Sequence, residues 1–195
     1  MNKRTLPCCG NAMIQRGFTL IEVMVVVAIV AILLSIAAPN LVAFQRNSEL
    51  RSTASGFLAA VQLARAEAMK RGVDTYMIPA SGGNWANGWI VFADTDLDQA
   101  LNTATDTVIM QTGAIASKTA VVTGSANATA FADGSSGYIR FNGGGFSMAK
   151  ENTFRSGAIE FSVTGSTETR RVVLNNVGRA RLCDPAKDTT TACQQ

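Results

Sequence analysis

The arginines near the C-terminus are the side chains in this sequence best suited to binding chemistry. Arg179 and Arg181 follow the turn-forming residues 175–178, so on a strand they share one face, about 6.5 Å apart. Arg170 or Arg171 on the preceding strand would lie opposite them. Because guanidinium groups match phosphate oxygens, three arginines on one face of a hairpin could bind a nucleic-acid backbone. Basic residues also protect edge strands from aggregation or pair with a neighbouring protein, and spacing alone leaves these alternatives open.

Other patterns of chemically active residues give weaker indications. Residues 94–98, Asp-Thr-Asp-Leu-Asp, alternate acids as a calcium loop does. An EF-hand, however, needs glycine where Gln99 stands and glutamate where Thr105 stands. We therefore expect an aspartate-rich turn at Asp94 to Asp98 and no metal. The chain has no histidine, and we find no phosphate-binding glycine loop between a strand and a helix, so we expect neither an enzyme nor a cofactor.

An apolar segment near the N-terminus predicts where the chain is placed. Residues 18–38 carry one charge, Glu22, and as a helix they are about 31 Å long, the thickness of a hydrocarbon core. Lys3, Arg4 and Arg16 precede the segment and no acid does, so the positive-inside rule predicts a single membrane span with a cytoplasmic N-terminus. Glu22 lies in the first turn, where the helix dipole favours a negative charge. A positively charged partner is the other explanation for a carboxylate at Glu22 in an apolar segment.

The sequence of residues 17–22, Gly-Phe-Thr-Leu-Ile-Glu, resembles the processing motif of type IV pilins and type II secretion pseudopilins. The resemblance implies that a prepilin peptidase cuts between Gly17 and Phe18 and that Phe18 is then N-methylated. It also gives Glu22 a partner, the N-terminal amine of Phe18 on a neighbouring subunit of the filament. Residues 1–17 would be the leader. Its loss removes three of the 17 basic residues and leaves 14, which equals the 14 acidic residues.

The sequence pattern around these residues predicts an α+β fold. In this fold a long N-terminal helix packs on an antiparallel β-sheet domain. Pro39 should kink or briefly unwind the helix between its membrane half and its amphipathic half, residues 39–71. From residue 72 to residue 195, short β-type runs separated by glycine, asparagine and serine predict a β-rich domain. The buried face of the second helical half would hold Leu50, Ala54, Phe57, Leu58, Val61, Ala64 and Ala68. The expected strands cover residues 75–78, 89–93, 108–112, 120–123, 137–142, 158–163, 170–174 and 179–183.

The C-terminal region extends the resemblance. Residues 88–94, the glycine-rich turn 142–145 and the closing residues 178–183 are similar to minor pilins of the FimT and FimU kind, relatives of the GspH pseudopilins. Members of this group cap or prime a pilus among other pilins. In FimT-like proteins a glycine-arginine-any-arginine element is associated with DNA binding in natural transformation, and Gly178, Arg179 and Arg181 match it. Because the hairpin lacks aromatic residues, DNA would be held non-specifically, through its backbone.

The same resemblance implies a subunit held in the bacterial inner membrane before assembly and in a periplasmic or extracellular pilus, at or near its tip, afterwards. Cys8 and Cys9 would leave with the leader, and oxidising conditions would favour a disulfide between Cys183 and Cys193. Two other functions stay open. One is a minor pilin that primes assembly without binding DNA, or a GspH-type pseudopilin of a type II secretion system. The other is a single-pass or secreted domain of enzymatic or sensory type.

Overall fold

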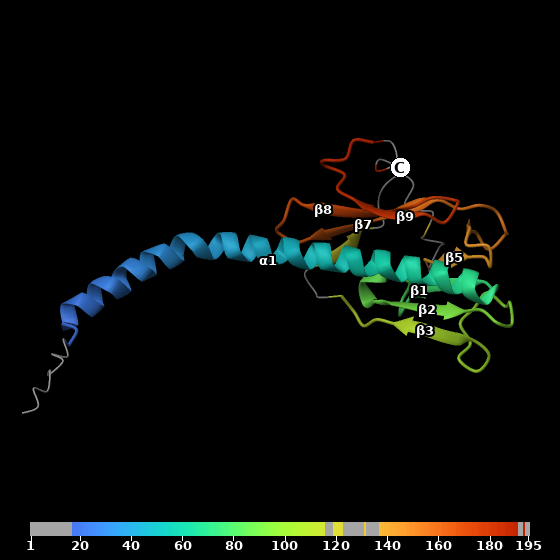
Figure 1. Cartoon of the computed structure of the whole chain (residues 1–195), viewed down its shortest axis with the longest axis horizontal. Helices are drawn as coiled ribbons and strands as arrows, with labels where there is room; N and C mark the ends of the chain where they lie inside the picture. The colour runs from blue at the N-terminus through green and yellow to red at the C-terminus, as the bar shows by residue number, and fades with distance from the viewer. Residues whose placement is uncertain (1–16, 116–118, 123–130, 132–136, 191–192, 194–195) are drawn as a thin grey trace, which may run out of the picture. The chain divides into compact units, whose positions relative to one another are not determined.

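The computed structural model describes residues 17–115, 119–122, 131, 137–190 and 193, and for residues 36–40 and 119–122 it describes the backbone alone. The chain divides into two compact units, Met1–Leu41 and Val42–Gln195. Helix α1 (Leu20–Arg71) contributes residues to both units (Figure 1). The architecture is α+β, with one long helix followed by antiparallel strands, as the sequence predicts.

The first unit consists of the beginning of α1, and its apolar side chains are exposed. Phe18 is 81% exposed, and large apolar side chains from Leu20 to Leu34 are about half exposed or more. Thr19 caps the helix, because its Oγ1 accepts a hydrogen bond of 3.3 Å from the backbone nitrogen of Glu22. No helix in the described part of the chain is long and apolar enough to cross a membrane, so the span expected at residues 18–38 is not confirmed.

Helix α1 continues through Pro39 without the unwinding that we expected there. Its helical backbone runs unbroken from Leu20 to Arg71. A proline in a helix removes one backbone donor and crowds the preceding turn, but the helical hydrogen bonds before and after it remain. The unwinding expected at Pro39 is therefore wrong, whereas the kink that we gave as its alternative stays a prediction.

In the second unit, α1 packs with the face that the sequence predicts. Leu50, Ala54, Phe57, Val61, Ala64 and Ala68 are buried in one core cluster, and Leu58 packs partly buried against it. Phe57 lies at the centre of the aromatic contacts, with ring centroids 5.2 Å from Trp85, 5.1 Å from Trp89 and 5.3 Å from Phe161. Trp85 lies in a short 3-10 helix, and Trp89 and Phe161 lie in two different strands, so one helical side chain joins distant parts of the sequence.

Two antiparallel sheets complete the second unit. The five-stranded sheet has the order β3-β2-β1-β5-β6, and the four-stranded sheet has the order β4-β7-β8-β9. Both contribute to the core cluster around α1, through Met77 and Val91 from the first sheet and Ile159 and Val172 from the second. All eight expected strands are confirmed to within about two residues at their ends, and the sequence missed β6 and the short 3-10 helix η1 (Trp85–Asn87). The strands are β1 (Thr75–Pro79), β2 (Trp89–Ala93), β3 (Thr107–Gln111), β4 (Thr119–Val122), β5 (Ile139–Phe141), β6 (Ser147–Met148), β7 (Gly157–Val163), β8 (Thr169–Leu174) and β9 (Ala180–Cys183).

Candidate nucleic-acid interface

The hairpin of β8 and β9 is held by a tight turn that requires glycine. Gly178 has a φ of 80°, and a side chain there would collide with the carbonyl oxygen of Gly145. The backbone nitrogen of Gly178 donates to the Asn175 carbonyl oxygen at 3.0 Å. The backbone nitrogen of Arg179 donates to Asn175 Oδ1 at 2.8 Å. The turn therefore fixes the backbone from which Arg179 projects.

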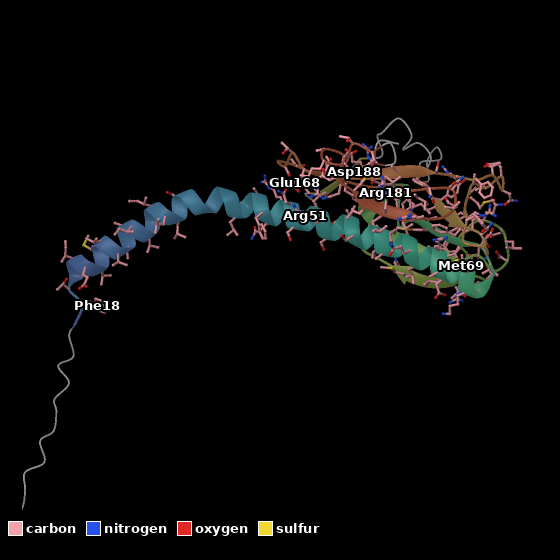
Figure 2. All side chains as sticks on the ribbon, turned by 45° about the horizontal axis from the view of Figure 1, so that its top comes forward. Phe18, Arg51, Met69, Glu168, Arg181 and Asp188 are labelled. Atoms are coloured by element: carbon pink, nitrogen blue, oxygen red, sulfur yellow. A yellow bond between two sulfur atoms is a disulfide. The ribbon has the colours of Figure 1, made fainter. Side chains whose placement is uncertain are left out.

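Arg179 and Arg181 both reach the surface, but their surroundings differ. Arg179 is exposed, and within the described residues its guanidinium has no hydrogen-bond or ion-pair partner. The Arg181 side chain is 36% exposed. Its Nη2 lies 3.2 Å from Thr190 Oγ1 and 3.8 Å from Asp188 Oδ2, and Figure 2 shows Arg181 and Asp188 close together. Arg179 thus offers its whole charge to a ligand, whereas Arg181 shares its charge with a carboxylate.

Asp188 is ionised at neutral pH. Hydrogen bonds from the hydroxyl and the backbone nitrogen of Thr190 lower the pKa of Asp188 below its usual value, and the positive charge of Arg181 adds to the effect. An anion that binds Arg181 must therefore compete with this carboxylate.

Arg170 and Arg171 do not complete a basic surface, and the expectation that one of them would is wrong. Both residues are only 8% exposed. Arg170 forms ion pairs of 2.9 Å with Glu168 and with Asp184. Because of this neutralisation and burial, Arg170 is not available to an external phosphate.

Arg171 illustrates why strand alternation alone was misleading. Across the hairpin, Arg171 pairs with Cys183 and Val173 pairs with Arg181. Because Arg171 and Val173 are two residues apart on one strand, Arg171 and Arg181 do share a face of the sheet. The neighbouring strand, however, places Glu160 opposite Arg171, and their side chains form a 2.6 Å ion pair. The Arg171 guanidinium also donates to the Cys193 carbonyl oxygen at 2.6 Å. The chain after β9 therefore covers this end of the face.

Arg65 of α1 is a residue of this surface that the sequence did not indicate. Its Nε donates to the Gly145 carbonyl oxygen and its Nη2 to the Val177 carbonyl oxygen, each at 3.0 Å. It therefore clamps the hairpin turn to the turn after β5. Beside it lies an open groove of about 390 Å³, lined by Gln62, Arg65, Ala66, Met69, Gly178, Arg179 and Ala180. The one indication in the sequence that Arg65 lies near the sheet is its position three residues before Ala68, on the same face of the helix.

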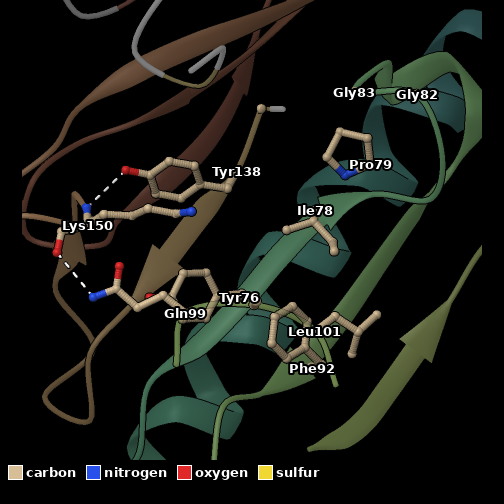
Figure 3. A pocket seen from close by; sticks show the side chains of 12 residues that line it. Tyr76, Ile78, Pro79, Gly82, Gly83, Phe92, Gln99, Leu101, Tyr138 and Lys150 are labelled. Atoms are coloured by element: carbon tan, nitrogen blue, oxygen red, sulfur yellow. Dashed lines mark hydrogen bonds between the residues drawn. The ribbon is translucent and has the colours of Figure 1, made fainter. Parts of the chain in front are cut away.

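A second cavity lies elsewhere on the same unit and is lined by aromatic side chains. It has a volume of about 290 Å³, and Figure 3 shows Tyr76, Phe92, Leu101 and Tyr138 around it. The backbone nitrogen of Lys150 donates to the Tyr138 hydroxyl at 2.9 Å. Burial raises the pKa of Tyr76 far above its usual value, so its hydroxyl stays protonated. Such a cavity can hold an apolar group, but among its described lining residues no nucleophile lies beside a base.

The predicted disulfide is confirmed. Cys183 and Cys193 are bonded to each other. Together with Ala158 and Val173 they form a small buried cluster on the outer face of the four-stranded sheet. The bond fixes the segment that carries Asp188 and Thr190 beside Arg181.

Comparison with known proteins agrees with this arrangement of a long N-terminal helix and a β-rich domain. The pattern of the prokaryotic N-terminal methylation motif matches residues 13–38, and that of the type II transport protein GspH matches residues 53–178. Motif and fold together define a subunit of a pilin-type filament. The chain belongs to the GspH family and carries the prokaryotic N-terminal methylation motif.

Two crystal forms of one solved protein show the same fold, and a third solved structure is less similar. One crystal form of the type IV minor pilin FimU of Pseudomonas aeruginosa is 17% identical, covers 77% of this chain and 98% of its own, and has a TM-score of 0.51. A second crystal form is 16% identical, covers 74% and 99%, and has the same TM-score of 0.51. The minor pseudopilin EpsH of the Vibrio cholerae type 2 secretion system is 15% identical, covers 71% and 99%, and has a TM-score of 0.44. No curated protein is similar enough in sequence to count as a relative.

Proposed function

We propose that this minor pilin holds DNA non-specifically by its phosphate backbone during natural transformation, through Arg179 and Arg181 at or near the pilus tip. The observation that carries the proposal is the exposed guanidinium of Arg179, which has no partner among the described residues and borders the groove beside Arg65. Arginine forks match phosphate oxygens and need no base contact. Gly178 acts indirectly, because its positive φ sets the turn from which Arg179 projects.

Two phosphate contacts give weak binding with a defined salt dependence. Neutralising two phosphates of duplex DNA predicts a slope of about −1.8 in log affinity against log salt concentration. Affinity should then fall about 12-fold between 50 and 200 mM salt. Several subunits, or a neighbouring pilin with further basic residues, would be needed for tight capture.

The test is a titration of the purified chain in detergent with fluorescently labelled duplex DNA, followed by anisotropy at 50 and 200 mM salt. The variant Arg179→Gln with Arg181→Gln should lose most of its DNA affinity at 50 mM salt and most of its salt dependence. A matched control, Arg51→Gln with Lys150→Gln, removes two exposed positive charges away from the hairpin and should bind nearly as the unmodified chain does.

Equal DNA affinity of the hairpin variant and the unmodified chain would refute the proposal. The function would then be that of a minor pilin that primes or caps the pilus, or of a GspH-type pseudopilin in type II secretion. The carboxylate of Asp188 beside Arg181 favours this second candidate, because it already neutralises part of the basic hairpin.

We also propose that assembly follows the pilin route. A prepilin peptidase would cut between Gly17 and Phe18, Phe18 would be N-methylated, and residues 18–38 would lie in the inner membrane before entering the filament. The apolar side chains exposed from Phe18 to Leu34 support this, because they need lipid or neighbouring subunits to cover them. Glu22 would pair with the freed amine of a neighbouring Phe18. Mass spectrometry of the filament-bound protein tests the route, and any N-terminus other than N-methylphenylalanine contradicts it.

A further inference from the structure

Four aspartates converge in the connection between β2 and β3. Asp94, Asp96, Asp98 and Asp106 each present a carboxylate oxygen, and these oxygens all lie within 4.8 Å of one another. None of the four forms an ion pair with a lysine or arginine in the described part of the chain. Four ionised carboxylates this close repel one another, and a cation bound among them would relieve the repulsion.

Asp94 gives a second, independent indication of a ligand. It is completely buried, and its Oδ2 accepts a hydrogen bond of 3.1 Å from the backbone nitrogen of Gln99. Its Oδ1 is buried as well and has no hydrogen-bond partner. A buried carboxylate oxygen without a partner is costly, whereas a metal ion bound to that oxygen would satisfy it.

The loop also supplies what the sequence seemed to lack. Gln99 stands where a calcium loop has glycine, yet its φ is 64°, so the backbone makes the left-handed bend without glycine. Thr105 stands where the closing glutamate belongs, yet the next residue, Asp106, supplies a carboxylate. Asp106 is held by backbone nitrogens, from Thr95 at 3.0 Å to Oδ1 and from Asn102 at 2.8 Å to Oδ2. The two substitutions therefore do not exclude a metal site.

We propose that Asp94, Asp96, Asp98 and Asp106 bind one calcium ion. Every ligand atom is a carboxylate oxygen, which suits a hard divalent cation. The loop is irregular and Asp96 and Asp98 are exposed, so water can complete the coordination. Calcium tolerates such variable geometry, whereas magnesium demands a near-ideal octahedron and gives up its waters reluctantly. The site should therefore prefer calcium.

Calorimetric titration of the purified full chain in detergent with calcium chloride tests the proposal. We expect one ion per chain with a dissociation constant of roughly 10⁻⁴ M, as in extracellular calcium modules, and at least tenfold weaker binding of magnesium. Asp96→Asn with Asp98→Asn should weaken calcium binding at least tenfold, because two charged ligands become neutral. Glu151→Gln removes one exposed acid outside the cluster and should change the affinity less than twofold.

Thermal unfolding separates a metal site from a purely structural acidic turn. In EDTA the Asp96→Asn/Asp98→Asn variant should melt at or above the temperature of the unmodified chain, because repulsion is relieved. In 10 mM calcium the order should reverse, with the unmodified chain several degrees higher. The proposal is overturned by the absence of calcium binding at 10 mM, by unchanged binding in the double variant, by equal weakening in Glu151→Gln, or by magnesium binding as tightly as calcium.

Discussion

Removing the disulfide between Cys183 and Cys193 should destabilise the β-rich unit substantially. The bond closes a loop with a sequence separation of 10, and the chain-entropy relation gives about 2.8 kcal/mol for a loop of that size. The bond also keeps the Cys193 carbonyl oxygen 2.6 Å from the Arg171 guanidinium. Since hydrogen bonds to charged groups contribute about 1.5–3 kcal/mol, the variant Cys183→Ser with Cys193→Ser should lose about 3 kcal/mol if this hydrogen bond persists and about 4–6 kcal/mol if it is lost as well.

The assay is thermal unfolding of the unmodified chain and of this variant, each with and without a reducing agent. A loss of about 3 kcal/mol corresponds to about 6–12 °C for a unit of this size. Reduction should lower the melting temperature of the unmodified chain by a similar amount and leave that of the variant unchanged. If the variant melts within about 2 °C of the unmodified chain, the segment after β9 contributes little to stability and this reasoning is wrong.

Three further predictions concern single residues. Gly178→Ala should lower the free energy of unfolding by about 2 kcal/mol or more, because alanine is strained at a φ of 80° and meets the Gly145 carbonyl. Gly56→Ala, in open space on α1, should instead stabilise by about 0.5–1 kcal/mol in denaturant titrations. Tyr76→Phe should cost little at pH 7, because the buried hydroxyl has no partner. Burial raises the pKa of Tyr76, so stability present below pH 10 is lost as pH rises further. The Tyr76→Phe variant should lose less stability above pH 10 than the unmodified chain. If unfolding followed by circular dichroism shows the same loss above pH 10 in both, the buried Tyr76 hydroxyl is not its cause.

Much of the fold could be predicted because its signals are local. The spacing of Leu50, Phe57 and Val61 defines one face of a helix whatever it packs on, and that face is buried in the structure. The strands were found because alternating apolar residues and turn residues such as Gly178 act over a few positions. The unwinding expected at Pro39 did not occur, because the local rule considered only the proline and not the helix that continues on both sides of it.

The candidate sites depended on contacts that no local rule contains. Sequence alone indicated that Cys183 and Cys193 are suited to pair, and the disulfide confirms it. The sequence also predicted that Arg179 and Arg181 share a strand face, but β9 begins at Ala180, so Arg179 precedes the strand. Only the tertiary structure decided that Glu160 neutralises Arg171, because the register of β7 against β8 places the two residues opposite each other. It likewise decided that Asp106 joins the other aspartates, because the chain folds back before β3. Periodicity is a property of neighbouring residues, whereas the charge that a ligand meets depends on the partners that strand pairing and loop folding bring beside it.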